Sequence, residues 1–189
     1  MIPLGLVVAD TEAEGPGRRF ALWVQGCPLR CPGCCNPELL PFRGGTPTDP
    51  DALVARILAT PGIEGISLLG GEPTAHAAGL ARVAAAVQAA GLTVMLYTGF
   101  TLDALRARGD ADVDALLAAC DLVVDGPYDR TQPDTTRRWI GSRNQGLHAL
   151  TGAYDLADPR FHAGETLEIR LVGGEIVVNG WPWKGRGLP

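Results

Sequence analysis

Apolar runs of strand length alternate with helical patterns along most of this chain, and this alternation restricts the folds that it can adopt. Strands are predicted at residues 20–24, 65–69, 92–97 and 121–124. Helices are predicted at residues 50–59, 78–90, 102–108 and 112–119, several of them beginning after a Thr or Asp cap such as Thr48 or Thr101. Repeated strand, helix and strand segments produce parallel strands joined by crossover helices. We therefore expect an α/β protein with a parallel sheet.

The pattern changes beyond residue 150. Residues 166–172 and 175–179 flank the pair Gly173-Gly174, which is a β-hairpin signal. Because two strands alone are marginally stable in water, this hairpin is interpreted as an extension and not as a second domain. We expect one domain over residues 1–189, with its core at residues 1–150 and the extension at residues 151–189.

Composition and charge exclude some classes of function. The formal net charge is −5 and Lys184 is the only lysine, so no basic stripe is available for nucleic acid. The apolar opening at residues 4–9 is too short for a signal peptide and lacks a basic flank. No segment approaches the roughly 18 apolar residues that cross a membrane. We expect a cytoplasmic protein without a nucleic-acid or membrane partner.

Three cysteines in the Pro- and Gly-rich segment WVQGCPLRCPGCCNPE indicate the chemistry. Cys27, Cys31 and Cys34 follow a C-x3-C-x2-C pattern. In a reducing compartment such crowding favours metal or redox chemistry over structural disulfides. A 4Fe-4S cluster held by three thiolates keeps one iron open for a small molecule. A structural zinc site needs four closed ligands, usually as two separated pairs, and the second pair is missing here.

The remaining candidate ligands are poorly placed to complete a zinc site. Cys35 adjoins Cys34 and would be strained as a fourth ligand, and Cys120 ends a predicted helix. The histidines show no ligand spacing; they are His76, His148 and His162. A cluster is therefore favoured, with zinc kept as an alternative.

Candidate functional segments follow each of the four predicted strands. The segments are the cysteine loop, Gly70-Gly71-Glu72, Thr98-Gly99-Phe100 and Asp125-Gly126-Pro127-Tyr128. Open α/β sheets and barrels place their active sites at the carboxyl ends of strands. Residues 128–148 are polar and Arg-rich, and we expect them to form a long loop that covers this rim.

Five segments occur in a characteristic order over roughly residues 1–150: EGPGRRFALWVQGCPLRCPGCCNP, GISLLGGEP, VMLYTGFTLDAL, DLVVDGPYD and WIGSRNQ. Together they closely resemble the radical S-adenosylmethionine (SAM) activating enzymes, above all the activating proteins of anaerobic ribonucleotide reductase. The resemblance implies a partial, open parallel β/α barrel of the radical SAM type, here followed by a small C-terminal β-hairpin.

The resemblance also implies the roles of individual residues. The cluster ligands are Cys27, Cys31 and Cys34, with SAM bound to the open iron. The residues implied as cofactor contacts are Gly33, Cys35, Gly70, Gly71, Glu72, Thr98 and Asp125. In this scheme the backbone and carboxylate of the GGE element meet the SAM ammonium group. Ordinary turn chemistry is an alternative explanation for the glycine pair and for Asp125.

The implied activity is removal of hydrogen from a glycine of a partner glycyl radical enzyme, with electrons from a flavodoxin- or ferredoxin-type donor. Relatives usually carry Arg before Gly-Ser and a small residue after it, whereas this chain has Ile140 and Arg143 there. Because of this difference and the C-terminal extension, a first alternative function is kept: a radical SAM enzyme that modifies a peptide or small metabolite. A noncatalytic iron-sulfur or zinc module is the second alternative.

Trp181 and Trp183 are interpreted as core packing or a partner patch.

Overall fold

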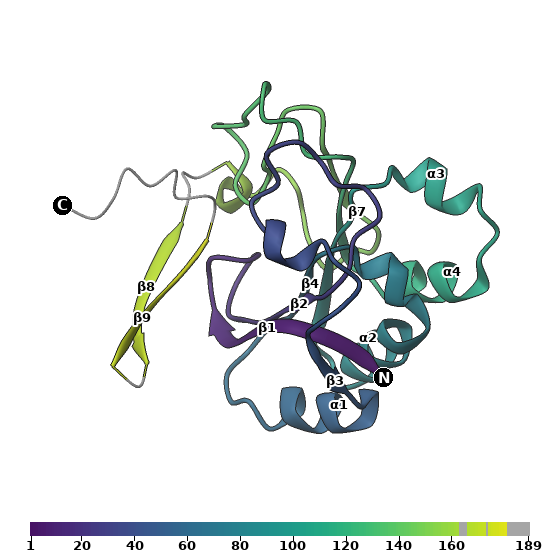
Figure 1. Ribbon diagram of the computed structural model, residues 1–189, viewed down its shortest axis with the longest axis vertical. Coiled ribbons are helices and arrows are strands. Elements are labelled where there is room, and N and C mark those ends of the chain that lie inside the picture. The colour runs from purple at the N-terminus through teal and green to yellow at the C-terminus, as the bar shows by residue number, and fades with distance from the viewer. Residues whose placement is uncertain (163–165, 173, 181–189) are drawn as a thin grey trace.

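The computed structural model describes residues 1–162, 166–172 and 174–180 (Figure 1). It contains a seven-stranded sheet in the order β3-β1-β2-β4-β5-β6-β7. The strands are β1 (Ile2–Thr11), β2 (Arg19–Val24), β3 (Thr46–Thr48), β4 (Gly65–Gly70), β5 (Thr93–Tyr97), β6 (Leu122–Asp125) and β7 (Gly146–Ala149). Strands β2, β4, β5 and β6 are parallel, whereas β1, β3 and β7 pair antiparallel at the two sides. The predicted α/β class with parallel central strands is confirmed. The partial, open barrel of the radical SAM type stays a prediction.

The four predicted helices are present at nearly the expected bounds. They are α1 (Pro50–Leu58), α2 (Ala77–Ala89), α3 (Leu102–Arg106) and α4 (Ala111–Ala118), with the short 3-10 helices η1 (Pro37–Leu39), η2 (Pro73–His76) and η3 (Pro159–Phe161). Thr101 caps α3 as predicted. Thr48 does not cap α1, because the cap is Asp49, whose carboxylate accepts the N–H groups of Asp51 and Ala52. Thr48 instead ends β3.

One face of the sheet packs against all four helices. Leu22, Leu68 and Leu96 of the central strands are fully buried in a single apolar cluster with Leu80 of α2 and Leu116 of α4. Parallel strands between layers are buried on both faces, which explains why they appear in the sequence as continuous apolar runs. The helices thus fix the strands whose carboxyl ends carry the motifs.

On the opposite face of the sheet, strands β5 and β6 are covered by the chain that follows β6. Met95 and Val124 of the strands pack there with Trp139, Ile140 and Phe161. The Trp139 and Phe161 rings meet edge to face with their centroids 5.6 Å apart. The segment predicted as a long loop is therefore an ordered cover, and it contains the short strand β7.

The C-terminal hairpin is confirmed as an antiparallel pair of β8 (Leu167–Val172) and β9 (Glu175–Gly180). Strands β1, β3 and β7 were not predicted. Trp181 and Trp183 lie outside the described residues. None of the helices in the described ranges has the length and apolar character needed to span a bilayer.

Candidate functional site

The carboxyl ends of β2, β4, β5 and β6 meet at a cavity of about 400 Å³. Eight of the predicted site residues line it: Cys27, Cys31, Cys34, Cys35, Gly70, Gly71, Glu72 and Thr98. Gly33 and Asp125 are not among the lining residues. The cavity has the size of an ordinary small-molecule site. Tertiary structure therefore brings together three motifs that are separated in sequence.

The cysteine loop is folded by backbone hydrogen bonds. The Cys34 N–H donates to the Cys31 carbonyl at 3.1 Å, which forms a tight turn between these two residues. The Cys27 N–H donates to the Leu40 carbonyl at 3.0 Å, so the segment after the loop closes back on its start. Gly33 has a φ of 77°, a conformation that glycine adopts without strain. Gly33 thus shapes the loop.

The donor set of the loop fits an iron-sulfur cluster. Within the described residues, no group of three His, Cys, Asp or Glu side chains is arranged to hold a single metal ion. A 4Fe-4S cluster makes a different demand, because its cysteine thiolates are distributed over separate irons. Cys27, Cys31 and Cys34 line one cavity and could supply three such thiolates. Burial raises the pKa of the Cys27 thiol, so bound iron is what would stabilise its thiolate form.

The glycine pair after β4 is required by close contact with the start of the cysteine loop. The Gly71 N–H donates to the Val24 carbonyl and the Glu72 N–H to the Gly26 carbonyl, both at 2.8 Å. A Cβ on Gly70 would lie 2.3 Å from the Val24 nitrogen, and one on Gly71 would lie 2.2 Å from the Gly26 oxygen. Gly70 also has a φ of 113°. Larger residues would push the two walls of the cavity apart.

Glu72 is almost completely buried, and both of its carboxylate oxygens have protein partners. Oε1 accepts from the Thr74 N–H at 3.0 Å, the Thr74 hydroxyl at 2.7 Å and the Thr98 hydroxyl at 2.9 Å. Oε2 accepts from the Gly99 N–H at 2.9 Å. A carboxylate has about four acceptor positions. The carboxylate therefore holds the ends of β4 and β5 together, and its direct contact with SAM stays a prediction.

Thr98 and Asp125 have different surroundings. Thr98 lines the cavity, and its N–H donates to the Val124 carbonyl at 2.9 Å. Asp125 Oδ2 accepts the Leu102 N–H at the start of α3 at 2.7 Å, and Oδ1 lies 2.9 Å from His148 Nε2. Both Asp125 oxygens thus join β6 to its neighbours outside the cavity. The role of Asp125 as a cofactor contact stays a prediction.

Glu14 is a cavity residue that sequence reasoning missed. It lies in the connection between β1 and β2, and its carbonyl accepts the Ser67 hydroxyl at 2.5 Å. Fully buried Arg19 holds the same connection by donating to the Pro16 carbonyl at 3.1 Å. Burial raises the pKa of Glu14 to about 7. The only local signal was an acidic residue before Gly-Pro-Gly.

The segment from Trp139 to Gln145 supplies another wall that was predicted only as a covering loop. Gln145 Oε1 accepts the N–H groups of Gly141 and Ser142 at 3.1 and 3.0 Å. Gln145 Nε2 donates to the Gly126 carbonyl at 3.0 Å. These bonds tie the loop to the end of β6. Trp139, Gly141 and Gln145 consequently line the cavity.

The amino-acid sequence of this chain is similar to those of known proteins. The profile described as "4Fe-4S single cluster domain" matches residues 13–148, which include the cysteine loop and all four strand ends. An anaerobic ribonucleoside-triphosphate reductase-activating protein of Vibrio cholerae is 36% identical over 147 residues, covering 73% of this chain and 92% of the relative. The chain belongs to this family of 4Fe-4S activating proteins.

Further members of the family support this assignment. The anaerobic ribonucleoside-triphosphate reductase-activating protein of Escherichia coli K12 is 32% identical over 146 residues, covering 72% of this chain and 92% of the relative. A putative glycyl-radical enzyme activating enzyme of Haemophilus influenzae is 34% identical over 98 residues, covering 50% of this chain and 37% of that protein. The family membership implied by the motifs is confirmed, and it supports a 4Fe-4S cluster. The profile match ends at His148, before the hairpin.

Proposed function

We propose that this chain is an activating enzyme that removes hydrogen from a glycine of a partner glycyl radical protein. Cys27, Cys31 and Cys34 hold a 4Fe-4S cluster, SAM binds at its open iron, and a flavodoxin- or ferredoxin-type protein supplies the electron. The observation that supports this most strongly is that the three cysteines and the turn after β4 line one cavity of about 400 Å³. The names of the relatives support the choice of partner.

The chain's own residues provide position and shielding. When bound, the cluster and SAM supply reductive cleavage of a carbon–sulfur bond, which yields methionine and a 5′-deoxyadenosyl radical. Gly71 allows the strand end to approach the cysteine loop, and Glu72 fixes that strand end to its neighbour. The apolar side chains of Trp23 and Leu69 line the cavity and are largely buried. Such walls limit the water that could react with a radical.

Anaerobic reconstitution tests the cluster and the cleavage reaction. With iron and sulfide the protein should bind about four irons per chain. Addition of dithionite and SAM should release 5′-deoxyadenosine. Cys31→Ala should abolish both results, whereas Cys35→Ala and Cys120→Ala should retain the cluster. An intact cluster without 5′-deoxyadenosine would reject the enzyme and favour a noncatalytic iron-sulfur module.

Electron paramagnetic resonance tests the hydrogen donor. The reduced protein with SAM and an anaerobic ribonucleoside-triphosphate reductase of the same organism should produce a glycine-centred doublet. Reductive cleavage of SAM without this doublet, together with modification of a peptide or metabolite, would favour the other radical SAM class. The two measurements thus separate the radical chemistry from the identity of its target.

A further inference from the structure

Among the described residues, none covers one apolar face of the hairpin β8–β9. In Figure 1 the hairpin projects from the body of the protein on the side away from α2, α3 and α4. Its register places Ile169 opposite Val178 and Leu171 opposite Ile176, on the same face as Leu167. These five side chains form the apolar hairpin face, and they are between 43% and 75% exposed. Contiguous exposed apolar surface of this kind is typical of interaction sites.

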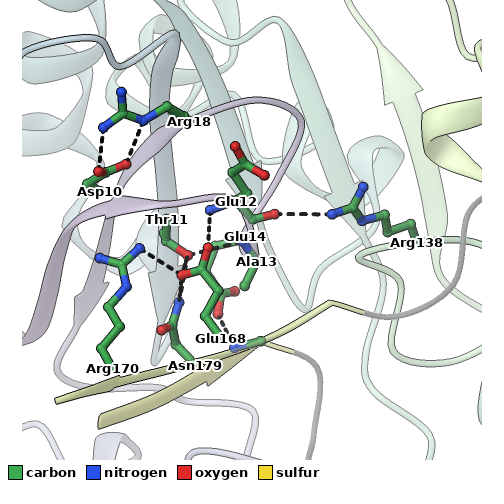
Figure 2. Close-up of polar contacts among 11 residues, drawn as sticks. Asp10, Thr11, Glu12, Ala13, Glu14, Arg18, Arg138, Glu168, Arg170 and Asn179 are labelled. Atoms are coloured by element: carbon green, nitrogen blue, oxygen red, sulfur yellow. Dashed lines mark hydrogen bonds and ion pairs between the residues drawn. The ribbon is translucent and has the colours of Figure 1, made fainter.

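The other face of the hairpin is fixed to the domain by polar contacts (Figure 2). Glu168 Oε1 accepts the Glu12 N–H, and Oε2 accepts the Thr11 hydroxyl, both at 2.7 Å. Asn179, directly opposite Glu168, donates to the Thr11 hydroxyl at 2.6 Å. Burial acts to raise the pKa of Glu168, but these hydrogen bonds and nearby Arg170 outweigh it and lower the pKa. The hairpin is thus anchored through its charged face and leaves its apolar face uncovered by the described residues.

The hairpin also forms part of the cavity wall. Val178, Asn179 and Gly180 line the cavity together with the cluster cysteines. The Gly180 N–H donates to Glu14 Oε1 at 3.0 Å, which joins the end of β9 to the connection between β1 and β2. Val178 belongs both to this wall and to the apolar hairpin face. The exposed face is therefore continuous with the edge of the site.

We propose that the apolar hairpin face docks the polypeptide that carries the target glycine, and that it positions this partner over the cavity. The inference rests on the proposed function. Because Val178 lines the cavity, a polypeptide held against Ile169 and Leu171 lies beside the edge of the cavity, close to where its glycine would enter. The hairpin lies outside residues 13–148, which the family profile matches, so the profile assigns no role to this face.

Charge and geometry disfavour two other occupants. An anionic membrane attracts apolar faces that are flanked by basic residues. Residues 166–180 contain two acidic residues, Glu168 and Glu175, against one basic residue, Arg170, so the hairpin itself offers little of this attraction. A second copy paired through the same face would cover Val178, a residue of the cavity wall, in both copies. A polypeptide partner uses the face without blocking its own entry.

The test is the double variant Ile169→Thr/Leu171→Thr, which keeps strand-forming residues and removes apolar surface outside the cavity wall. We expect binding to the anaerobic ribonucleoside-triphosphate reductase of the same organism to weaken by about tenfold or more. The yield of glycyl radical should fall at limiting reductase, while cluster content and SAM cleavage without reductase stay unchanged. Leu58→Thr, at an exposed position ending α1, is the matched control and should change nothing.

A second variant tests the anchor. Glu168→Ala leaves the apolar face intact but removes the acceptor that holds the hairpin, so reductase binding should weaken here too.

Wild-type affinity and radical yield in the double variant would overturn the docking inference, while SAM cleavage would still support the proposed function. Hairpin-dependent reductase binding without SAM cleavage would reject the proposed radical chemistry and keep the docking. Two results would assign the face to another occupant. In the first, the wild-type chain is a dimer and the double variant is a monomer. In the second, the wild-type chain binds phosphatidylglycerol vesicles and the double variant does not.

Discussion

The Thr98 hydroxyl donates a 2.9 Å hydrogen bond to the Glu72 carboxylate and joins the ends of β5 and β4 at the cavity. Both side chains are buried, so water cannot replace this bond. The Gly99 N–H donates to the other Glu72 oxygen at 2.9 Å. One carboxylate therefore sets the relative position of two cavity walls.

Glu72→Gln should destabilise the protein while preserving the shape of the side chain. The amide nitrogen would face an N–H or O–H donor, which leaves at least one buried donor unpaired and costs about 1–3 kcal/mol. SAM binding should weaken as well, because the strand ends move. Anaerobic urea unfolding measures the first effect, with Glu38→Gln at an exposed position as the control. Equal unfolding free energies for wild type and Glu72→Gln would contradict this role.

Gly71→Ala should prevent normal closure of the cysteine loop. Its Cβ would lie 2.2 Å from the Gly26 carbonyl oxygen, so backbone must shift, at a cost of about 1–3 kcal/mol. Cluster content after reconstitution should fall with stability. Gly152→Ala is a matched control, since no atom lies within 4 Å of a Cβ there. Similar iron content in Gly71→Ala and Gly152→Ala would show that the close approach is unimportant.

Cys120 should be chemically inert in the folded protein. It is fully buried, its thiol donates to the Leu116 carbonyl at 3.1 Å, and burial raises its pKa. Alkylation requires the thiolate and access to solvent. In the cluster-free protein, iodoacetamide should therefore label partly exposed Cys31 much faster than Cys120, as followed by mass spectrometry. Labelling of both at one rate without denaturant would disprove the burial.

Glu14 should make stability depend on pH in an unusual direction. Burial raises the pKa of Glu14 in the folded protein to about 7, above the ordinary value of 4.5. The folded state then binds more protons than the unfolded state between these values, so the contribution of Glu14 to stability falls as pH rises from about 4.5 to 7 and is constant above.

Glu14→Gln should remove the fall in stability between about pH 4.5 and 7, because the glutamine side chain does not ionise. Its amide oxygen can still accept the Gly180 N–H. The variant should gain stability relative to wild type across that pH range, by up to about 3 kcal/mol. Urea unfolding of both proteins from pH 4.5 to 8 measures the difference. A constant difference over the range would mean that Glu14 titrates normally.

The central strands and the helices could be predicted from the sequence, because apolar runs and capping residues are signals that lie within each element. The runs that became β4 and β6 are mostly apolar and almost entirely buried, as expected for strands between layers. Strand β1 escaped prediction because its burial is irregular and a register shift lies between Leu4 and Leu6. The α1 cap was misplaced by one residue, since Thr48 and Asp49 are both good caps and only the strand pairing of Thr48 decides between them.

The sequence by itself determined the family, because the cysteines and the glycine pair belong to short motifs that near neighbours in the chain define. Tertiary structure alone decided which other residues form the cavity. Glu14, Trp139 and Val178 are far apart in the chain and meet only because loops and a hairpin fold over the strand ends. The tertiary structure also places the Asp125 carboxylate outside the cavity, in contact with α3 and His148. Such long-range contacts leave no periodic or local signal, since they arise from packing between whole elements.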